Sequence, residues 1–266
     1  LHRRRHSFPT RRSSDLEFLG HDIPAVFQLK HQALQGKIWH LERSPMLILF
    51  SIVFVVGFVF AILRWGVPTA AYHIAMHLPE STLNNIGTQS EEYILKLTEP
   101  SQLSTARQAQ LKQEYLQLIG PDRPAKLIFR QGVSLSANAV ALPNNTIIVT
   151  DELVALAKDD QEILGVLAHE QGHLNHRHSL QQAISSFGVG IIVMAMSGDI
   201  SSLLSGLPLA VVDAQFSRHF ETDADLYALN QMQQQQIDVM HYAHLLQRLE
   251  QEAKDKSEGS DQIVKL

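Results

Sequence analysis

The sequence predicts an α+β, mainly helical domain with a small sheet, preceded by one transmembrane helix. Three observations predict this class. Apolar residues such as Leu111 and Tyr115 recur at helical spacing through much of the chain. Ala137–Leu142 and Thr146–Thr150 are short runs of strand-forming residues separated by turn residues. Met46–Leu63 is an uncharged apolar run, as a membrane span requires.

The chain begins with a segment that we interpret as an artefact. Within residues 1–16, Phe8–Leu16 reads as a common sequencing adapter translated in one frame. The alternative is an arginine-rich targeting or nucleic-acid-binding arm. Residues 17–45 are interpreted as the remnant of an N-terminal cytosolic module. Because the formal net charge is −5 and no basic patch is visible elsewhere, we predict no nucleic-acid partner.

Residues 46–67 are predicted to form the transmembrane helix. The run Met46–Leu63 carries no charge over 18 residues, and Trp65, Gly66 and Val67 extend it past Arg64. A signal peptide would have a shorter apolar run and a small-residue cleavage site. A buried core helix is the other alternative.

The orientation of this span is predicted from the basic residues that flank it. Lys30, Lys37 and Arg43 precede the span, whereas Arg64 alone follows closely. By the positive-inside rule, the N-terminus is cytoplasmic and the domain of residues 70–266 lies outside the cytoplasm.

The remaining elements follow from periodicity and turn residues. Pro143-Asn144-Asn145 indicates a hairpin between the two strands named above. We expect packed helices over Phe187–Val212, with peripheral membrane contact as the alternative. Leu78–Gly120 is predicted to be helical, with a segment of helical periodicity that starts at Pro100-Ser101. Other predicted elements are a strand over Lys126–Arg130, a short helix over Asp151–Lys158, a helix carrying Val239 to Leu249, and a flexible end over Lys254–Asp261.

His169-Glu170-Gln171-Gly172-His173 has the form H-E-x-x-H. On a helix, His169 and His173 project from one face and could share a zinc ion. Glu170 lies about 100° round the helix, where it could act as general base on the attacking water. Asp159, with Glu162 three residues on, gives this helix a capping-box start. A chance match is the alternative in a chain with 14 histidines.

A catalytic zinc needs a third protein ligand, and Glu221 could supply it. Asp225 is four residues further on, so both carboxylates share a helix face. Asp225 could accept the second ring N–H of a ligand histidine and fix its tautomer. The alternative is an acidic, solvated helix start. His176 and His178 are interpreted as exposed cations near a helix C-terminus, with metal ligation as the alternative.

Together these motifs resemble the gluzincin zinc metallopeptidases of the HtpX and CAAX-prenyl-protease (Ste-type) family, closest to single-anchor bacterial periplasmic members. The resemblance rests on H-E-x-x-H and on Ser217-Arg218-x-x-Glu221-x-x-Ala224-Asp225. It also rests on Asn138-Ala139-Val140-Ala141-Leu142-Pro143, although Val140 stands where the family usually has Phe.

The resemblance implies a zincin-like metallopeptidase domain at residues 70–266, with one Zn²⁺ per chain and protein or peptide substrates. It implies that Asn138, Ala139, Val140 and Ala141 form a strand to which an extended substrate adds; an ordinary edge strand is the alternative. We therefore expect an endopeptidase of envelope protein quality control, anchored in the bacterial inner membrane by a single span with its catalytic domain in the periplasm.

Two other functions stay open at this stage. One is cleavage of prenylated C-terminal motifs, which a single span disfavours. The other is a non-catalytic, chaperone-like relative, which an intact Glu170 disfavours. The family usually continues into an S-x-H-P segment, so we also expect the domain to be truncated at its C-terminus.

Overall fold

The computed structural model describes residues 45–121, 123–188, 201–212 and 214–263. The interpretations of residues 1–16 and of nearly all of 17–45 therefore lie outside the described residues, as does part of the predicted helical segment Phe187–Val212. The chain divides into two units, Leu1–Phe58 and Val59–Leu266, which are described separately.

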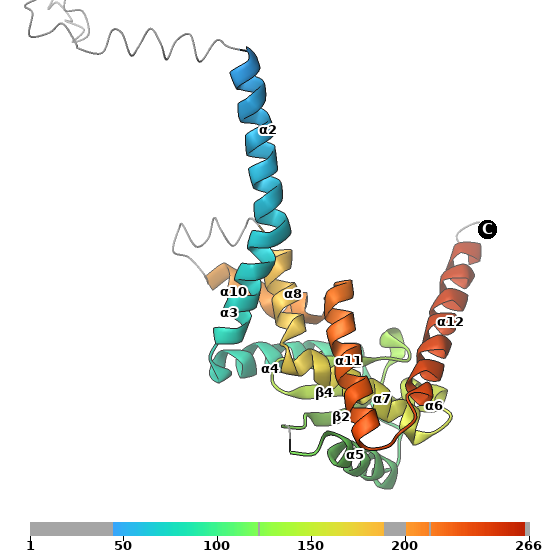
Figure 1. Cartoon of the computed structure of the whole chain (residues 1–266). Coiled ribbons are helices and arrows are strands. Elements are labelled where there is room, and N and C mark those ends of the chain that lie inside the picture. Colours follow the sequence, from blue (N-terminus) through green and yellow to red (C-terminus); the bar gives the residue numbers. More distant parts are fainter. Residues whose placement is uncertain (1–44, 122, 189–200, 213, 264–266) are drawn as a thin grey trace, which may run out of the picture. The chain divides into compact units, whose positions relative to one another are not determined.

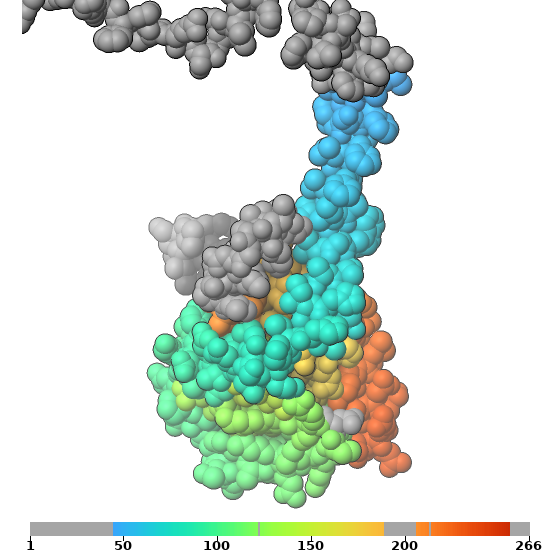
Figure 2. Space-filling view, turned by 90° about the vertical axis from the view of Figure 1, so that its left-hand side faces the viewer, coloured from blue at the N-terminus to red at the C-terminus, as the bar shows by residue number. Residues whose placement is uncertain are grey.

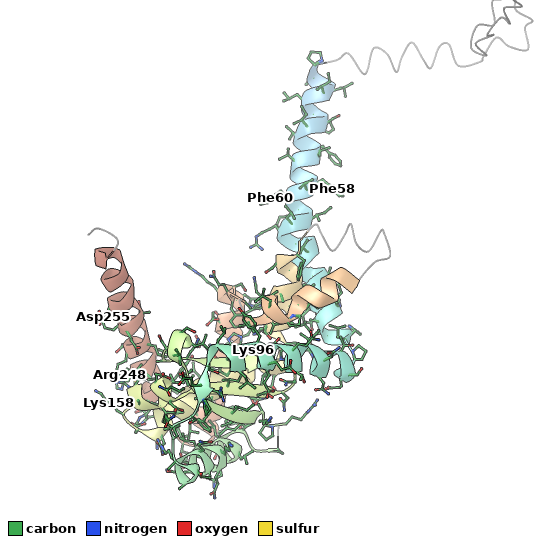
Figure 3. All side chains as sticks on the ribbon, turned by 180° about the vertical axis from the view of Figure 1, so that it is seen from behind. Phe58, Phe60, Lys96, Lys158, Arg248 and Asp255 are labelled. Atoms are coloured by element: carbon green, nitrogen blue, oxygen red, sulfur yellow. The ribbon has the colours of Figure 1, made fainter. Side chains whose placement is uncertain are left out.

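The apolar run forms a helix. Helix α2 spans Pro45–Ala61 and is followed by a π-helical turn, η2, at Ile62–Gly66. Its apolar side chains are exposed, and Phe58 and Phe60 project from the ribbon in Figure 3. The helical stretch Pro45–His77 is long and apolar enough to cross a membrane, and among the described residues it is the one such stretch. Exposure of these side chains argues against the buried core helix.

The unit Val59–Leu266 combines helices with a small mixed sheet, as expected (Figure 1). Its described helices are α3 (Val67–His77), α4 (Glu80–Leu97), α5 (Thr105–Ile119), η3 (Val133–Leu135), α6 (Asp151–Leu156), α7 (Asp160–Asn175), α8 (His178–Ser186), α10 (Ser201–Val212), α11 (Arg218–Gln234) and α12 (Met240–Ile263). The predicted helical segment Leu78–Gly120 is thus two helices: Ser104, whose side chain accepts the Arg107 amide, caps the second.

The described strands form one four-stranded sheet with the order β1-β2-β4-β3. They are β1 (Glu99–Pro100), β2 (Lys126–Gln131), β3 (Ala139–Leu142) and β4 (Thr146–Thr150). Strand β4 runs parallel to β2 and antiparallel to β3. The predicted hairpin is confirmed: residues 143–145 join β3 to β4, and Asn145 takes the left-handed conformation that such turns need (φ 56°). Strand β3 lies at the sheet edge.

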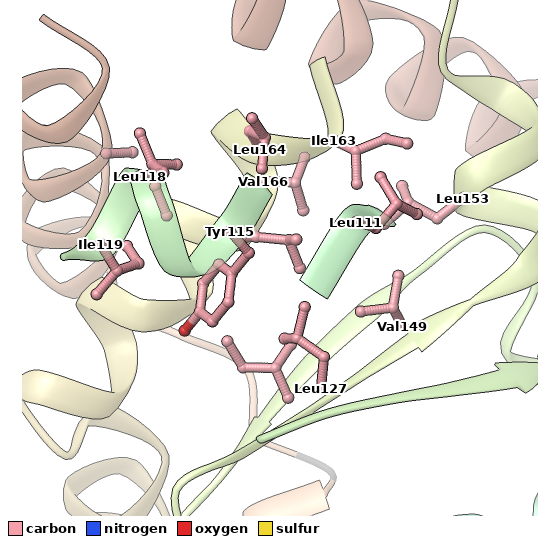
Figure 4. Close-up of a cluster of buried hydrophobic side chains, with 14 of the residues drawn as sticks. Leu111, Tyr115, Leu118, Ile119, Leu127, Val149, Leu153, Ile163, Leu164 and Val166 are labelled. Carbon is pink, nitrogen blue, oxygen red and sulfur yellow. The ribbon is translucent and has the colours of Figure 1, made fainter. Parts of the chain in front are cut away.

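A buried apolar cluster holds α7, the helix that carries the H-E-x-x-H residues, against the sheet and α5. Leu111 and Tyr115 of α5 pack with Leu127 of β2, Val149 of β4 and Ile163 of α7 (Figure 4). Burial of such side chains contributes roughly 1.5–3 kcal/mol each. The position of α7 is therefore fixed by the core.

A second contact places the hairpin beside α4. A Cβ on Gly87 would lie 2.3 Å from the backbone nitrogen of Asn144, so this position requires glycine. In Figure 2 the blue-green atoms of α4 adjoin the yellow-green atoms of the hairpin.

The C-terminal helix is longer than expected. The stretch Lys254–Asp261, predicted to be flexible, continues helix α12, which is described through Ile263. Lys254 and Glu250 form an i,i+4 ion pair along it. In Figure 3 the labelled Arg248 of α12 lies near Lys158, and both contact Glu162 of α7: Arg248 by an ion pair, Lys158 through its amide at 2.8 Å.

Candidate metal centre

Helix α7 presents the H-E-x-x-H residues as the sequence predicts. Its N-cap is Asp159, whose side chain accepts the amide of Glu162 at 3.0 Å. Glu162 reaches back to the amide of Lys158 rather than to that of the cap residue. The helix then brings Nε2 of His169 to 3.0 Å from Nε2 of His173.

Helix α11 delivers Glu221 to the same point. Ser217 caps this helix by accepting the amide of Phe220, so Glu221 falls in its first turn. The Glu221 carboxylate oxygens lie 3.6 Å from Nε2 of His169 and 3.7 Å from Nε2 of His173. Within the described part of the chain, these three residues form the one group of histidine and carboxylate side chains that could hold a metal ion together, with ligand atoms within 4.8 Å of one another.

Small residues make this convergence of two helices possible. A Cβ on Gly172 would lie 2.9 Å from Cα of Ala224, closer than real Cβ contacts come. Gly172 is on α7 next to His173, and Ala224 is on α11 between Glu221 and Asp225. The close approach of the two backbones therefore sets the distance between the histidines and the carboxylate.

The ring of His169 is held from behind by two groups. Its Nδ1 lies 2.9 Å from Oδ1 of Asp225, within reach of a hydrogen bond that would fix the tautomer of the ring. The hydroxyl of Tyr242, on α12, lies 2.8 Å from that nitrogen and donates to the same Asp225 oxygen at 2.8 Å. Nε2 of His169 is thereby directed at the shared point. Tyr242 was not predicted as a site residue.

Gly165 lets α12 come this close to α7. A Cβ at Gly165 would lie 2.6 Å from Cβ of Tyr242. A glycine inside a helix usually has a packing reason, so Gly165, one turn before His169, was a readable signal that another element approaches here.

The ring of His173 is buried and stacked. Phe216 lies parallel to it at 4.1 Å between centroids. Its Nδ1 lies 3.0 Å from Nδ1 of His178. Burial and the neighbouring His169 lower the pKa of His173 to about 2, so the ring is neutral and keeps a lone pair for a metal.

The prediction that His178 is an exposed cation is wrong. Its side chain is buried, and burial lowers its pKa to about 4. Arg177 takes the left-handed conformation (φ 54°) between α7 and α8, so that α8 begins at His178, whose ring lies against His173 of α7. His176, in contrast, is exposed and contacts the Gly172 carbonyl at 3.0 Å.

Glu170 lies between the metal-ligating group and the sheet edge. The amide of Ala141 donates to its carboxylate, while burial and then the charge of Glu221 raise the pKa of Glu170 to about 8. Asn138 is exposed, and Ala139 and Val140 are half-buried. Ala141 is buried and already engaged by Glu170, so the four residues expected to bind substrate are not equally open.

The fold and the site define a class, the metal-dependent peptidases: two histidines and a glutamate converge while a second carboxylate, that of Glu170, stands beside them. The model of "Peptidase family M48" matches residues 105–258, and the chain belongs to this family of metalloproteases.

The chain is also similar to proteins that are named as metalloproteases. The chain is 30% identical over 119 residues to the mitochondrial metalloendopeptidase OMA1 of Schizosaccharomyces pombe, covering 42% of this chain and 34% of OMA1. It is 29% identical over 119 residues to the metalloprotease LoiP of Escherichia coli (42% of this chain, 47% of LoiP). It is 31% identical over 109 residues to the metalloprotease YcaL of the same species (38% and 42%). The matches thus span less than half the length of each relative.

Proposed function

We propose that this chain is a membrane-anchored zinc endopeptidase that hydrolyses peptide bonds in extended protein segments. The observation that carries the proposal is the convergence of His169, His173 and Glu221, with Glu170 beside them. The carboxylate of Glu221 lies among the ligand atoms, and that of Glu170 lies outside them. Glu221 can therefore bind the metal while Glu170 transfers protons.

The ligand set suits one zinc ion. Three atoms about 2 Å from a tetrahedral ion lie about 3.3 Å apart, and the separations here are 3.0, 3.6 and 3.7 Å. Two imidazoles and one carboxylate leave the fourth position open, as catalytic zinc sites require. Zinc held there would lower the pKa of a water to about 7 and polarise the substrate carbonyl.

Glu170 is the general base and then the proton donor in this proposal. Its carboxylate accepts a proton from the attacking water and returns it to the leaving amine. The pKa of about 8 in the protein alone would leave Glu170 mostly protonated at neutral pH. A dication at the three ligand atoms offsets the charge of Glu221, which favours the ionised form that a base needs.

The sheet edge supports an extended peptide as the substrate. Asn138, Ala139 and Val140 lie on or just before the edge strand β3, where main-chain hydrogen bonds could hold a peptide irrespective of its sequence. A pocket of about 290 Å³ adjoins this edge. Its lining residues are Ala137, Asn138, Ala139, Leu153, Val166, His169, Glu170, Tyr242, Leu246 and Leu249.

The membrane and cellular assignments are part of the proposal. The apolar stretch Pro45–His77 supports a single anchor, and the basic residues before it support a periplasmic catalytic domain in a bacterial inner membrane. The resemblance to single-anchor family members supports envelope protein quality control over cleavage of prenylated proteins. A reporter active outside the cytoplasm and fused after Ala70 tests the orientation: we expect activity. A reporter active in the cytoplasm at that position would reverse the assignment.

The decisive experiment compares wild type with Glu170→Gln for zinc content and casein digestion. Glutamine keeps the shape of the side chain but accepts no proton at neutral pH. We expect about one zinc per chain in both proteins, with casein digested by wild type alone. Equal digestion by the variant would assign the base elsewhere, and zinc-loaded wild type without turnover would favour the non-catalytic, chaperone-like alternative.

A further inference from the structure

His178 is the partner of His173 on the side away from the metal-ligating group. The two Nδ1 atoms are 3.0 Å apart, while Nε2 of His173 faces Nε2 of His169. His178 also stacks on Phe220 of α11, 4.3 Å between centroids and 14° from parallel. Backbone and packing hold this ring in place, so the contact does not depend on a mobile surface side chain.

The chemistry of a metal ligand fixes the hydrogen positions in this pair. If Nε2 of His173 donates its lone pair to a metal, the proton of the neutral ring must be on Nδ1. That N–H then needs an acceptor, because an unsatisfied buried donor costs about 1–3 kcal/mol. Nδ1 of His178 is the atom in reach, and it accepts if the proton of His178 is on Nε2.

The other side of His178 suits that tautomer. Its Nε2 lies 3.9 Å from Oδ2 of Asp223, on the helix that carries Glu221. The Asp223 carboxylate also faces Nε2 of His219 at 3.7 Å. A negative group on this side favours a proton on Nε2 of His178, which leaves Nδ1 free to accept.

We propose that His178 is a positioning residue for the metal ligand His173: its Nδ1 accepts the Nδ1–H of His173, and the negative charge of Asp223 favours the proton of His178 on Nε2. The inference rests on the proposed metal site. The two histidine ligands would then differ in character, since a carboxylate and a phenol back His169 whereas a neutral imidazole backs His173.

Two substitutions of His178 remove opposite properties of the ring. In His178→Asn, the amide oxygen takes about the position of Nδ1, so the acceptor stays while the stacking on Phe220 is lost. In His178→Phe, the aromatic ring stays and the acceptor is lost. His176→Phe is the matched control, because His176 contacts the Gly172 carbonyl rather than a metal ligand.

We expect zinc affinity, measured by competition with a chelator, to fall about 10- to 100-fold in His178→Phe, the usual effect of removing such a partner. The zinc affinity of His178→Asn should stay nearer to that of wild type, and the zinc affinity of His176→Phe should equal that of wild type. The unfolding midpoints should show the opposite order for the two His178 variants, with His178→Asn less stable than His178→Phe. If Asn loses more zinc affinity than Phe, the ring acts through packing and the proposal fails.

A spectroscopic readout tests the tautomer directly. Long-range ¹H–¹⁵N spectra of the zinc-loaded protein should show the proton of His173 on Nδ1 and that of His178 on Nε2. The reverse assignment for His178 would overturn the proposal. Wild type that binds no zinc would instead refute the proposed function, so the two failures are distinguishable.

Discussion

The hydroxyl of Tyr242 donates a hydrogen bond of 2.8 Å to Oδ1 of Asp225, which links the C-terminal helix to the helix that carries Glu221. The same hydroxyl lies 2.8 Å from Nδ1 of His169. Tyr242 is buried, and burial with the charge of Asp225 raises the pKa of its hydroxyl far above the usual range. The hydroxyl therefore stays protonated, and able to donate, well above neutral pH.

Tyr242→Phe should weaken the metal site without abolishing it. Removing the hydroxyl deprives Asp225 of one donor and costs about 1 kcal/mol of stability. Zinc affinity should fall several-fold, less than the 10- to 100-fold loss for removing a direct partner of a ligand. Chelator competition and urea unfolding measure the two effects. Tyr72→Phe, the same change on an exposed residue, is the control; equal behaviour of the two variants would contradict the role.

Gly165→Ala should destabilise the protein, although alanine is the better helix former. Ala in place of Gly would contribute about 1 kcal/mol from helix propensity alone. The new Cβ would lie 2.6 Å from Cβ of Tyr242, and such overpacking typically costs about 1–3 kcal/mol. We expect a net loss on urea unfolding, with weaker zinc binding as α12 moves away. A gain in stability would show that α12 does not pack this closely.

Glu221→Ala should abolish stable metal binding, because two histidines alone are too few ligands for the usual catalytic site. Asp225→Ala should retain zinc with affinity reduced by about 10- to 100-fold. Metal analysis after dialysis distinguishes the two. Thr222→Ala is the control: this exposed neighbour uses its hydroxyl on the Arg218 carbonyl at 2.8 Å. Full zinc retention in Glu221→Ala would sink the assignment of the third ligand.

The pair Arg107–Asp160 should make stability depend on pH. Nη1 of Arg107 donates to Oδ2 of Asp160 at 2.7 Å, and this contact lowers the pKa of Asp160 below its ordinary 3.8. A lowered carboxyl pKa contributes stability that is present above pH 4 and lost as pH falls through the folded-state value. Arg107→Gln should therefore cost roughly 1 kcal/mol at pH 7, and this cost should shrink as the pH falls below 4. A constant difference across that range would show that packing, not charge, is lost.

Local signals in the sequence predicted much of the fold. The cap at Asp159, the hairpin turn at residues 143–145 and the apolar periodicity of α5 each act within a few residues, so their structures follow from short segments. Pro100-Ser101 marked the start of the second helical segment, but the short strand β1 between α4 and α5 was not predicted. There, Glu99 and Pro100 pair with β2, a tertiary contact that overrides helical periodicity.

For the site, the H-E-x-x-H spacing predicted which residues converge, because a helix fixes their relation. Glu221 and Asp225 were predicted from their own spacing and from the demand for a third ligand. His178 was misassigned because the left-handed turn at Arg177 places it at the start of α8, and nothing nearby in the sequence encodes that turn. Tyr242 arrives from α12, 73 residues from His169, through a contact no local pattern specifies.

The strand order of the sheet has a consequence for how the protein folds. Strand β4 follows β3 in the chain, yet it lies between β3 and β2 and is buried along its whole length. The β3–β4 hairpin is the local pairing and can close in about 1–10 µs, whereas β2 cannot join until β4 is present. Changes in the 143–145 turn should therefore slow refolding more than they hasten unfolding. The edge beside Glu170 would be among the first parts to form, and the convergence of α7 with α11 among the last.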